Sequence, residues 1–184
     1  MRVISGTLRG RRLSAPVGLA TRPTTDRIRE SLFNILAAGI RNRHVLDLFA
    51  GTGALGIEAM SRGAASAVFV DRARPALAAI RRNLLELGLT DQTRVINWDI
   101  GKNLNCLASA PQAFDLVFMD PPYETNCVMP ALTALVSCGA LAPDARVVIE
   151  HSAREPLRHP IGTLGLADQR RFGKTLVSFM EPML

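Results

Sequence analysis

The 184-residue sequence lacks any run of eighteen apolar residues, the length that a helix needs to cross a bilayer. Its N-terminus carries arginines but no apolar stretch of the kind that marks a secretory signal. The three cysteines form no CxxC pair, and the three histidines show no metal-ligand spacing, which disfavours a disulfide framework and a zinc site. These absences predict a cytoplasmic protein with no membrane partner and no metal.

Acidic residues are missing from the start of the chain, where none precedes Asp26. Five arginines stand in that segment: Arg2, Arg9, Arg11, Arg12 and Arg22. Such a segment, in a chain of net charge +6, fits a polyanionic partner. Twenty arginines against two lysines can also reflect a compositional habit of the source genome, so charge alone leaves both explanations open.

The length predicts one domain over residues 1–184, with a basic hairpin and connection at 1–24 and a catalytic core at 25–184. Hydrophobic patterns predict helices over 25–39, 54–63, 74–88, 101–110 and 129–139. They predict strands over 44–51, 66–71, 94–99, 114–120, 145–151, 164–173 and 174–181. Strands that alternate with helices indicate a doubly wound α/β fold with a mostly parallel sheet covered on both faces.

Several predicted strands are apolar until a terminal acid. Asp71, Asp99 and Asp120 each stand at the carboxyl end of such a strand. Open α/β sheets bind their ligands outside the carboxyl ends of the strands. The shared placement of these three carboxylates therefore predicts a ligand site at that edge of the sheet.

A glycine-rich turn follows the first strand of the core. Gly51, Gly53 and Gly56 form G-x-G-x-x-G before a helix, and Asp71 follows twenty residues after the first glycine, where a carboxylate can bind both ribose hydroxyls. Asp47, inside the preceding strand, would repel a pyrophosphate but suits an ammonium group. The pattern therefore predicts an adenosine cofactor, with S-adenosylmethionine favoured over a nicotinamide dinucleotide.

The predicted strand 114–120 ends in Asp120-Pro121-Pro122-Tyr123. The two prolines fix the backbone and remove two N–H donors, so that the Asp120 carboxylate and the Pro121 carbonyl remain as acceptors. Two acceptors in a rigid turn can hold the two N–H donors of a nucleobase amino group, and Tyr123 offers a ring on which the base can stack. The motif predicts methylation of a nucleobase amino group, with positioning as the main catalytic effect.

These stretches resemble a known family. "LDLFAGTGALGIEAMSRGA" with "MDPPY" is similar to the S-adenosylmethionine-dependent amino-methyltransferases of nucleic acid. Together with "MRVISGTLRGRRL", "TRPTTDRIRESLFNIL" and "RRFGKTLVSF", the whole chain resembles the bacterial 16S rRNA (guanine-N2) methyltransferase D family. The resemblance implies a seven-stranded Rossmann-like methyltransferase sheet with an antiparallel last strand, and a small N-terminal hairpin that touches 16S rRNA within a 30S subunit or assembly intermediate.

The predicted site has three parts. The residues expected to bind S-adenosylmethionine are Asp47, Phe49, Ala50, Gly51, Thr52, Gly53, Asp71, Arg72, Asp99 and Ile100. Those expected to be catalytic are Asp120, Pro121, Pro122 and Tyr123. Those expected to bind RNA are Arg9, Arg11, Arg12 and Arg22. No match is evident over residues 155–165, whose role stays open.

Several alternatives stay open. A DNA adenine-N6 methyltransferase also uses Asp-Pro-Pro-Tyr, although the chain has no room for the usual target-recognition region. A protein glutamine methyltransferase would more often carry Asn-Pro-Pro-Tyr, and a non-catalytic RNA-binding relative would have damaged motifs. Among single residues, Trp98 suits core packing or adenine contact, Glu58 a pocket wall or a solvated face, and Arg170-Arg171 a solvated face.

Overall fold

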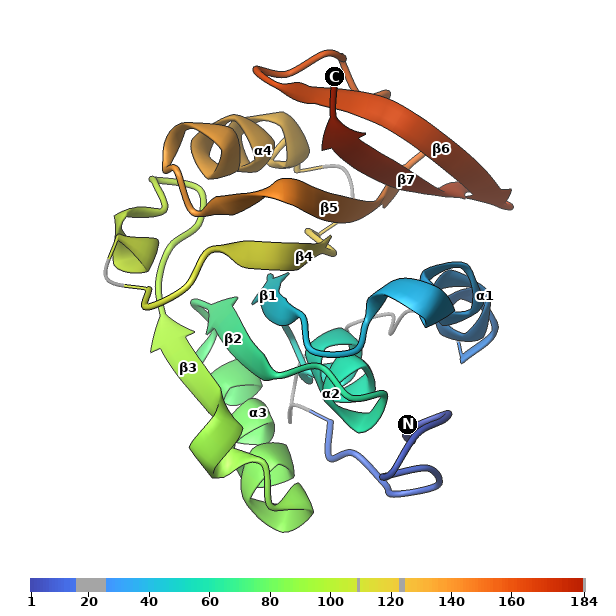
Figure 1. The fold of residues 1–184 in the computed structure, drawn as a ribbon, viewed down its shortest axis with the longest axis vertical. Coiled ribbons are helices and arrows are strands. Elements are labelled where there is room, and N and C mark those ends of the chain that lie inside the picture. Colours follow the sequence, from blue (N-terminus) through green and yellow to red (C-terminus); the bar gives the residue numbers. More distant parts are fainter. Residues whose placement is uncertain (16–25, 109, 123–124, 184) are drawn as a thin grey trace.

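A computed structural model describes residues 1–15, 26–108, 110–122 and 125–183. It contains a seven-stranded sheet in the order β3-β2-β1-β4-β5-β7-β6 (Figure 1). The strands are β1 (His44–Leu48), β2 (Ser66–Asp71), β3 (Thr93–Asn97), β4 (Phe114–Met119), β5 (Leu141–Ser152), β6 (Leu164–Phe172) and β7 (Thr175–Pro182). The first five run parallel, and β7 is antiparallel to β5 and to β6. The predicted Rossmann-like sheet with an antiparallel last strand is confirmed.

Helices cover both faces of this sheet. They are α1 (Asp26–Leu36), α2 (Ala54–Ser61), α3 (Arg74–Leu87) and α4 (Val128–Ser137). The first three lie on one face and α4 on the other (Figure 1). One buried cluster, which includes Phe33, Phe69 and Phe118, fills the space beneath α1, α2 and α3. A second, which includes Met119 and Leu132, lies beneath α4, so the sheet is buried on both sides as its apolar strands predict.

Helix α3 shows why this helix and its ends could be predicted from the sequence. Its inward positions, Leu77, Ile80 and Leu84, recur with helical spacing and are buried. Pro75 stands in its first turn, where a missing N–H leaves no broken bond. Gly88 ends the helix at a φ of 70°, a left-handed conformation in which a side chain would be strained. The predicted helix therefore has its predicted ends.

The predicted helix over 101–110 is wrong in the part that the structure describes, where the only helical element is a single 3₁₀ turn, Asn105–Leu107. Side chains compete with a helix here, because Asp99 Oδ1 accepts the Gly101 N–H at 3.2 Å and Asn103 Oδ1 accepts the Asn105 N–H at 3.0 Å. Two boundaries also differ from expectation: β5 begins at Leu141, and α1 gives way to a 3₁₀ turn over Ala37–Gly39.

The N-terminal segment folds back on itself as an antiparallel hairpin. Arg2 and Arg12 form a β-bridge, the Val3 N–H donates to the Arg11 carbonyl at 2.9 Å, and the Gly10 N–H donates to the Val3 carbonyl at 2.9 Å. The hairpin lies beside α2 and α3 (Figure 1). The predicted start of the first helix, at residue 25, lies outside the described residues.

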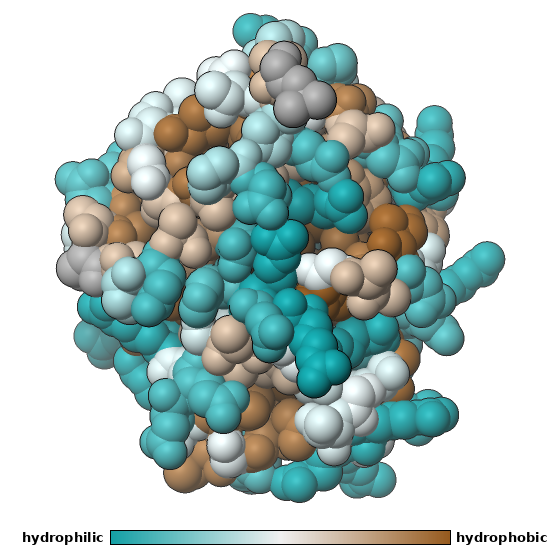
Figure 2. All heavy atoms as spheres, in the orientation of Figure 1, coloured by the Kyte–Doolittle hydropathy of each residue, from teal (hydrophilic) through white to brown (hydrophobic). Residues whose placement is uncertain are grey.

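The surface is mostly polar. Figure 2 shows hydrophilic side chains over much of the face seen in Figure 1, with apolar side chains at separate places among them. Within the four described ranges, no helix combines the length and apolar character that a membrane crossing requires.

Candidate active site

Asp47 lies at the centre of the carboxyl edge, buried within β1 and only 1% exposed. Its Oδ2 accepts the N–H of Gly56, in the first turn of α2, at 2.9 Å. Burial raises the pKa of Asp47 well above its usual range, and the nearby charges of Asp120 and Asp71 raise this pKa further. Asp47, Asp71 and Asp120, three of the four acids predicted for the site, are therefore close enough to interact, and a cation placed among them would be stabilised.

The turn after β1 is fastened to the end of β2. Asp71 Oδ2 accepts the Gly51 N–H at 2.9 Å, and Asp71 Oδ1 accepts the Ala73 N–H at 2.8 Å. Gly53 closes the turn by donating to the Ala50 carbonyl at 2.7 Å. Gly51 is thus brought together with Asp71, the residue predicted to bind the ribose, although the two are twenty residues apart in the sequence.

The glycines of this turn differ in what surrounds them. A Cβ on Gly56 would lie 2.4 Å from Phe69 Cε1, so this glycine lets α2 pack closely on β2. Gly51 has a φ of 56°, and among the described residues only the Phe49 carbonyl oxygen, at 3.9 Å, lies near the position of a Cβ. The space in front of Gly51 is therefore open to a ligand, which fits a cofactor held against the main chain.

A pocket of about 350 Å³ opens beyond β3. It is lined by Arg72, Asn97, Trp98, Asp99, Lys102 and Asn103. Two of the predicted cofactor residues, Arg72 and Asp99, form an ion pair at 3.4 Å on its rim. Trp98 both packs against the core and lines the pocket, with its indole N–H donated to the Asn103 carbonyl at 2.9 Å. Ile100 lies buried in the core beside them.

The predicted catalytic turn follows β4. Asp120 is half-buried, and its N–H donates to the Leu48 carbonyl of β1 at 3.5 Å. Pro121 is buried and Pro122 is exposed, and the Pro122 carbonyl accepts the Thr125 hydroxyl at 2.6 Å. Tyr123 lies outside the described residues.

A segment after β5 supports the far end of this turn. The Asn126 N–H donates to Glu155 Oε1 at 2.9 Å, and His151 Nδ1 lies 2.9 Å from the Glu155 carbonyl oxygen. His151 is buried, which lowers its pKa, and its Nε2 lies 2.8 Å from the Ser178 hydroxyl. Since Nδ1 faces carbonyl oxygens, it must carry the proton of a neutral ring. Residues 151–155 thus connect β7 to the predicted catalytic turn.

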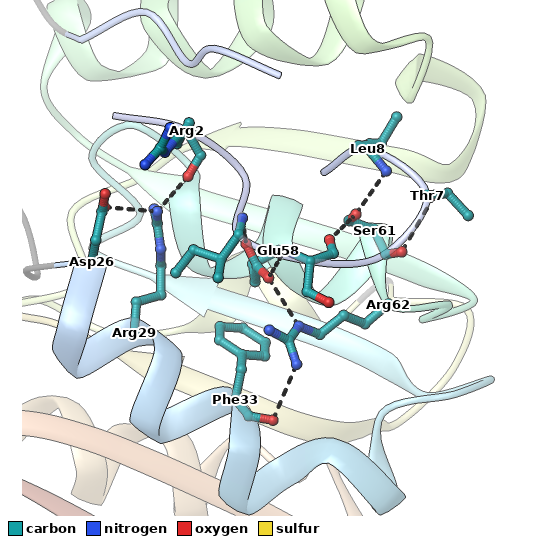
Figure 3. Close-up of polar contacts among 11 residues, drawn as sticks. Arg2, Thr7, Leu8, Asp26, Arg29, Phe33, Glu58, Ser61 and Arg62 are labelled. Carbon is teal, nitrogen blue, oxygen red and sulfur yellow. Dashed lines mark hydrogen bonds and ion pairs between the residues drawn. The ribbon is translucent and has the colours of Figure 1, made fainter. Parts of the chain in front are cut away.

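Glu58 lies neither on a pocket wall nor on a solvated face, the two places expected for it. Its side chain is fully buried and accepts the N–H groups of Ile4 and Ser5, at 2.8 and 3.0 Å. It also pairs with Arg62 at 2.9 Å (Figure 3). Ser61, one turn later, accepts the Leu8 N–H at 2.9 Å. The end of α2 therefore holds the N-terminal hairpin through buried polar contacts.

Arg29 of α1 lies on the other side of this hairpin and is fully buried (Figure 3). Its Nη2 donates to the Arg2 carbonyl and to Asp26 at 3.0 Å, while Nε and Nη1 have no hydrogen-bond partner within the described part of the chain. Burial lowers the pKa of Arg29. The hairpin is thus packed between α1 and α2.

The arginines of the hairpin are exposed, but not all are equally available to RNA. Arg11 Nη2 donates to the Glu86 carbonyl near the end of α3 at 2.7 Å, so this side chain has a structural contact. Arg9 and Arg12 are exposed, and Arg22 lies outside the described residues.

Asn83 is a site residue that sequence reasoning missed. It is 1% exposed, and its Nδ2 donates to the carbonyls of Thr52 and Ser14, at 3.0 and 3.1 Å. Its Oδ1 accepts the Ser14 N–H at 2.7 Å. Asn83 therefore ties the glycine turn to the end of the N-terminal hairpin. An amide on the inward face of α3, between Ile80 and Leu84, was the available signal.

Comparison of the sequence and the structure with known proteins identifies the family of the chain. Residues 1–181 match the family model described as conserved hypothetical protein 95. The chain is 38% identical to the ribosomal RNA small subunit methyltransferase D of Escherichia coli, over 85% of this chain and 77% of that protein. The chain belongs to the small subunit methyltransferase D family.

Other members have similar length and shape. YlbH of Bacillus subtilis, named provisionally as an rRNA methyltransferase, is 39% identical over 98% of both chains. The solved structure of yhhF from Escherichia coli, named provisionally as a methyltransferase, aligns with a TM-score of 0.86 at 35% identity, over 99% of this chain and 97% of that one. Membership of the methyltransferase D family, predicted from the motifs, is confirmed, and the protein is a methyltransferase.

Proposed function

We propose that this protein transfers a methyl group from S-adenosylmethionine to the exocyclic N2 of a guanine in 16S rRNA, within a 30S subunit or an assembly intermediate. The observation that carries the proposal is the grouping of Asp47, Asp71 and Asp120 at one edge of the sheet. The name of the Escherichia coli relative supports small-subunit rRNA as the substrate.

The residues around the glycine turn fit S-adenosylmethionine better than a dinucleotide. Asp71, already fixed by two backbone N–H groups, would accept hydrogen bonds from the ribose. Asp47 is buried, so the ammonium group of the amino-acid part would stabilise the ionised form of this carboxyl, whereas a pyrophosphate would oppose it. The pocket beside Arg72, Trp98 and Asp99 would take the adenine.

S-adenosylmethionine, when bound, supplies a methyl carbon that the amino nitrogen attacks, so that the N–C bond forms, the C–S electron pair goes to sulfur, and the nitrogen then loses a proton. The protein's part is to hold the amino group. The Asp120 carboxylate and the Pro121 carbonyl would accept its two N–H bonds and draw its lone pair toward the methyl group. Positioning of this kind can contribute several kcal/mol, on the order of 7 in favourable cases.

Transfer of a labelled methyl group tests the proposal. Total RNA, 30S particles, DNA and protein extract would be offered separately, and the products digested and identified by mass spectrometry. We expect N2-methylguanosine in 16S rRNA or 30S particles. N6-methyladenine in DNA, or methylglutamine in protein, would keep the fold and chemistry but overturn the substrate. Binding of S-adenosylmethionine without transfer to any acceptor would contradict the proposed enzyme.

A further inference from the structure

The turn between β6 and β7 lies at the same edge of the sheet as the predicted catalytic residues. Strand β7 is antiparallel to β5, and its first residue, Thr175, pairs with Ser152, the last residue of β5. Strands β4 and β5 are parallel, with Met119 opposite Ile149, so Asp120 follows at the same edge. The Gly173-Lys174 turn therefore projects from the carboxyl edge.

Hydrogen bonds connect this turn to the segment that follows the catalytic turn. The Ala153 N–H donates to the Lys174 carbonyl at 2.9 Å, and two residues later Glu155 accepts the Asn126 N–H at 2.9 Å. Neighbouring strands lie about 4.8 Å apart, so β7 is roughly 10 Å from β4 across β5. That span covers about three phosphates of one strand if its bases stack as in a duplex, at roughly 3.4 Å of helix axis each.

The turn carries exposed positive charge. Arg171 and Lys174 are exposed, and neither forms an ion pair with a carboxylate among the described residues. Arg171 Nε donates to the Gly173 carbonyl at 3.0 Å, which keeps its guanidinium on the turn. Arg170 differs, because Asp168 pairs with it at 2.9 Å.

The carboxylates nearby do not cancel this charge. Glu155 accepts a backbone N–H of the catalytic turn, Asp168 is paired with Arg170, and Glu150 is buried at 7% exposure. A guanidinium and an ammonium left without carboxylates, about three phosphates from the reacting position, match a sugar-phosphate backbone.

We propose that Arg171 and Lys174, on the β6–β7 turn, bind phosphates of the RNA strand that carries the target guanine. This inference rests on the proposed function and assigns a second RNA contact, separate from the N-terminal hairpin. The turn would anchor the strand on one side of the catalytic residues, and the hairpin would contact RNA elsewhere. Sequence alone favoured a solvated face for Arg170 and Arg171; the position of Arg171 at the carboxyl edge changes that interpretation for this residue.

The test neutralises both charges while keeping polar side chains, in an Arg171→Gln/Lys174→Gln variant. The matched control, Arg41→Gln/Arg94→Gln, removes the same charge from exposed residues near the opposite, amino edge of β1 and β3. Binding of 30S particles and of 16S rRNA would be measured across salt concentrations, together with kcat, KM and S-adenosylmethionine affinity. Melting temperature would verify that both variants fold.

We expect the turn variant to raise KM and the RNA dissociation constant about tenfold, with kcat and cofactor affinity unchanged. Its slope of log affinity against log salt should be shallower by about 1.5, because each phosphate contact contributes roughly 0.7 to 0.9. Wild-type affinity and slope in this variant, or an equal loss in the control, would overturn the inference. Methylation of rRNA by the wild type would still support the proposed function in that case, whereas methylation of DNA or protein alone would remove both.

Discussion

The two sides of the candidate active site are built differently. On the cofactor side, the glycine turn is held by acceptors and donors from three other elements: Asp47 in β1, Asp71 in β2 and Asn83 in α3. On the target side, the contacts after Asp120 include those of the Thr125 hydroxyl with Pro122 and Cys127 and that of the Asn126 N–H with Glu155, all exposed.

This difference separates what is fixed before binding from what depends on the substrate. Buried hydrogen bonds between distant elements fix a backbone strongly, because breaking one leaves an unpaired polar group without water. Exposed contacts exchange readily with water and fix a backbone weakly. We therefore expect the cofactor side to be preformed and the target side to gain its order from RNA.

The largest effect should come from the target side. Asp120→Ala removes the charged acceptor for the amino group, so we expect kcat to fall by about 1,000-fold, the order found when one preorganised catalytic hydrogen bond is lost. Affinity for S-adenosylmethionine should change little. Single-turnover methylation of 30S particles and calorimetric titration of the cofactor would measure the two. Full activity in this variant would contradict the mechanism.

The converse test is on the cofactor side. Asp71→Ala removes the acceptor of the Gly51 and Ala73 N–H groups as well as the expected ribose contact. A loss of about 2–3 kcal/mol, or roughly 50-fold in cofactor affinity, follows from charged hydrogen bonds of this kind. The rate at saturating cofactor should fall far less. Asp71→Asn, which keeps one acceptor, should lie between; a wild-type dissociation constant in the Ala variant would exclude Asp71 from the site.

Sequence patterns predicted the arrangement of the glycine turn and of the acids beside it, because these features are local or regularly spaced. The G-x-G-x-x-G turn, the acid twenty residues on, and the apolar strands each follow from short-range rules, and they gave the sheet and Asp47, Asp71 and Asp120 at one edge. Resemblance then supplied the family. Roles for Arg72, Asp99 and Ile100 came only from that resemblance, and remain predictions.

The Gly56 position tests the packing that makes this side rigid. A Cβ there would lie 2.4 Å from Phe69 Cε1 and 3.1 Å from Asp47 Oδ2, so Gly56→Ala must displace helix or ring. We expect a loss of about 2 kcal/mol in the free energy of unfolding and a melting temperature lower by roughly 6 °C. Gly39→Ala, with no atom of the described residues within 4 Å of its added carbon, is the matched control and should melt like the wild type.

We expect the ionisable group of Asp47 to lower the free energy of unfolding at neutral pH while it favours cofactor binding. Its pKa is raised by burial, so above about pH 4 the unfolded chain releases a proton that the folded protein retains, and stability falls as pH rises toward the folded pKa. Asp47→Asn keeps an acceptor for the Gly56 N–H without this penalty. We expect it to be more stable by about 1 kcal/mol at pH 7, with no gain near pH 4 and weaker cofactor binding. Melting curves across pH would check the sign, and a uniform loss of stability would refute it.

The contacts that sequence did not predict all join distant segments. Glu58 and Ser61 hold the N-terminal hairpin 53 residues or more away, and Asn83 reaches both Ser14 and Thr52. A polar residue on a helix is compatible with solvent, a pocket or a buried partner, and only the tertiary arrangement decides among them. Glu58 is an example: the pattern of its helix is compatible with solvent, a pocket or a buried partner, and the structure shows that the hairpin buries it.

The smallest effect should come from the support of the catalytic turn. Glu155→Ala removes the acceptor of the Asn126 N–H, an exposed hydrogen bond worth about 0.5–1 kcal/mol. We expect kcat to fall about threefold, with cofactor affinity and melting temperature unchanged, while Glu155→Gln, which retains an acceptor oxygen, stays near wild type. Amide hydrogen exchange at Asn126 should quicken in the Ala variant alone. If exchange and kcat are the same in both variants, Glu155 does not order this turn, and the target side depends on RNA even more than the contacts indicate.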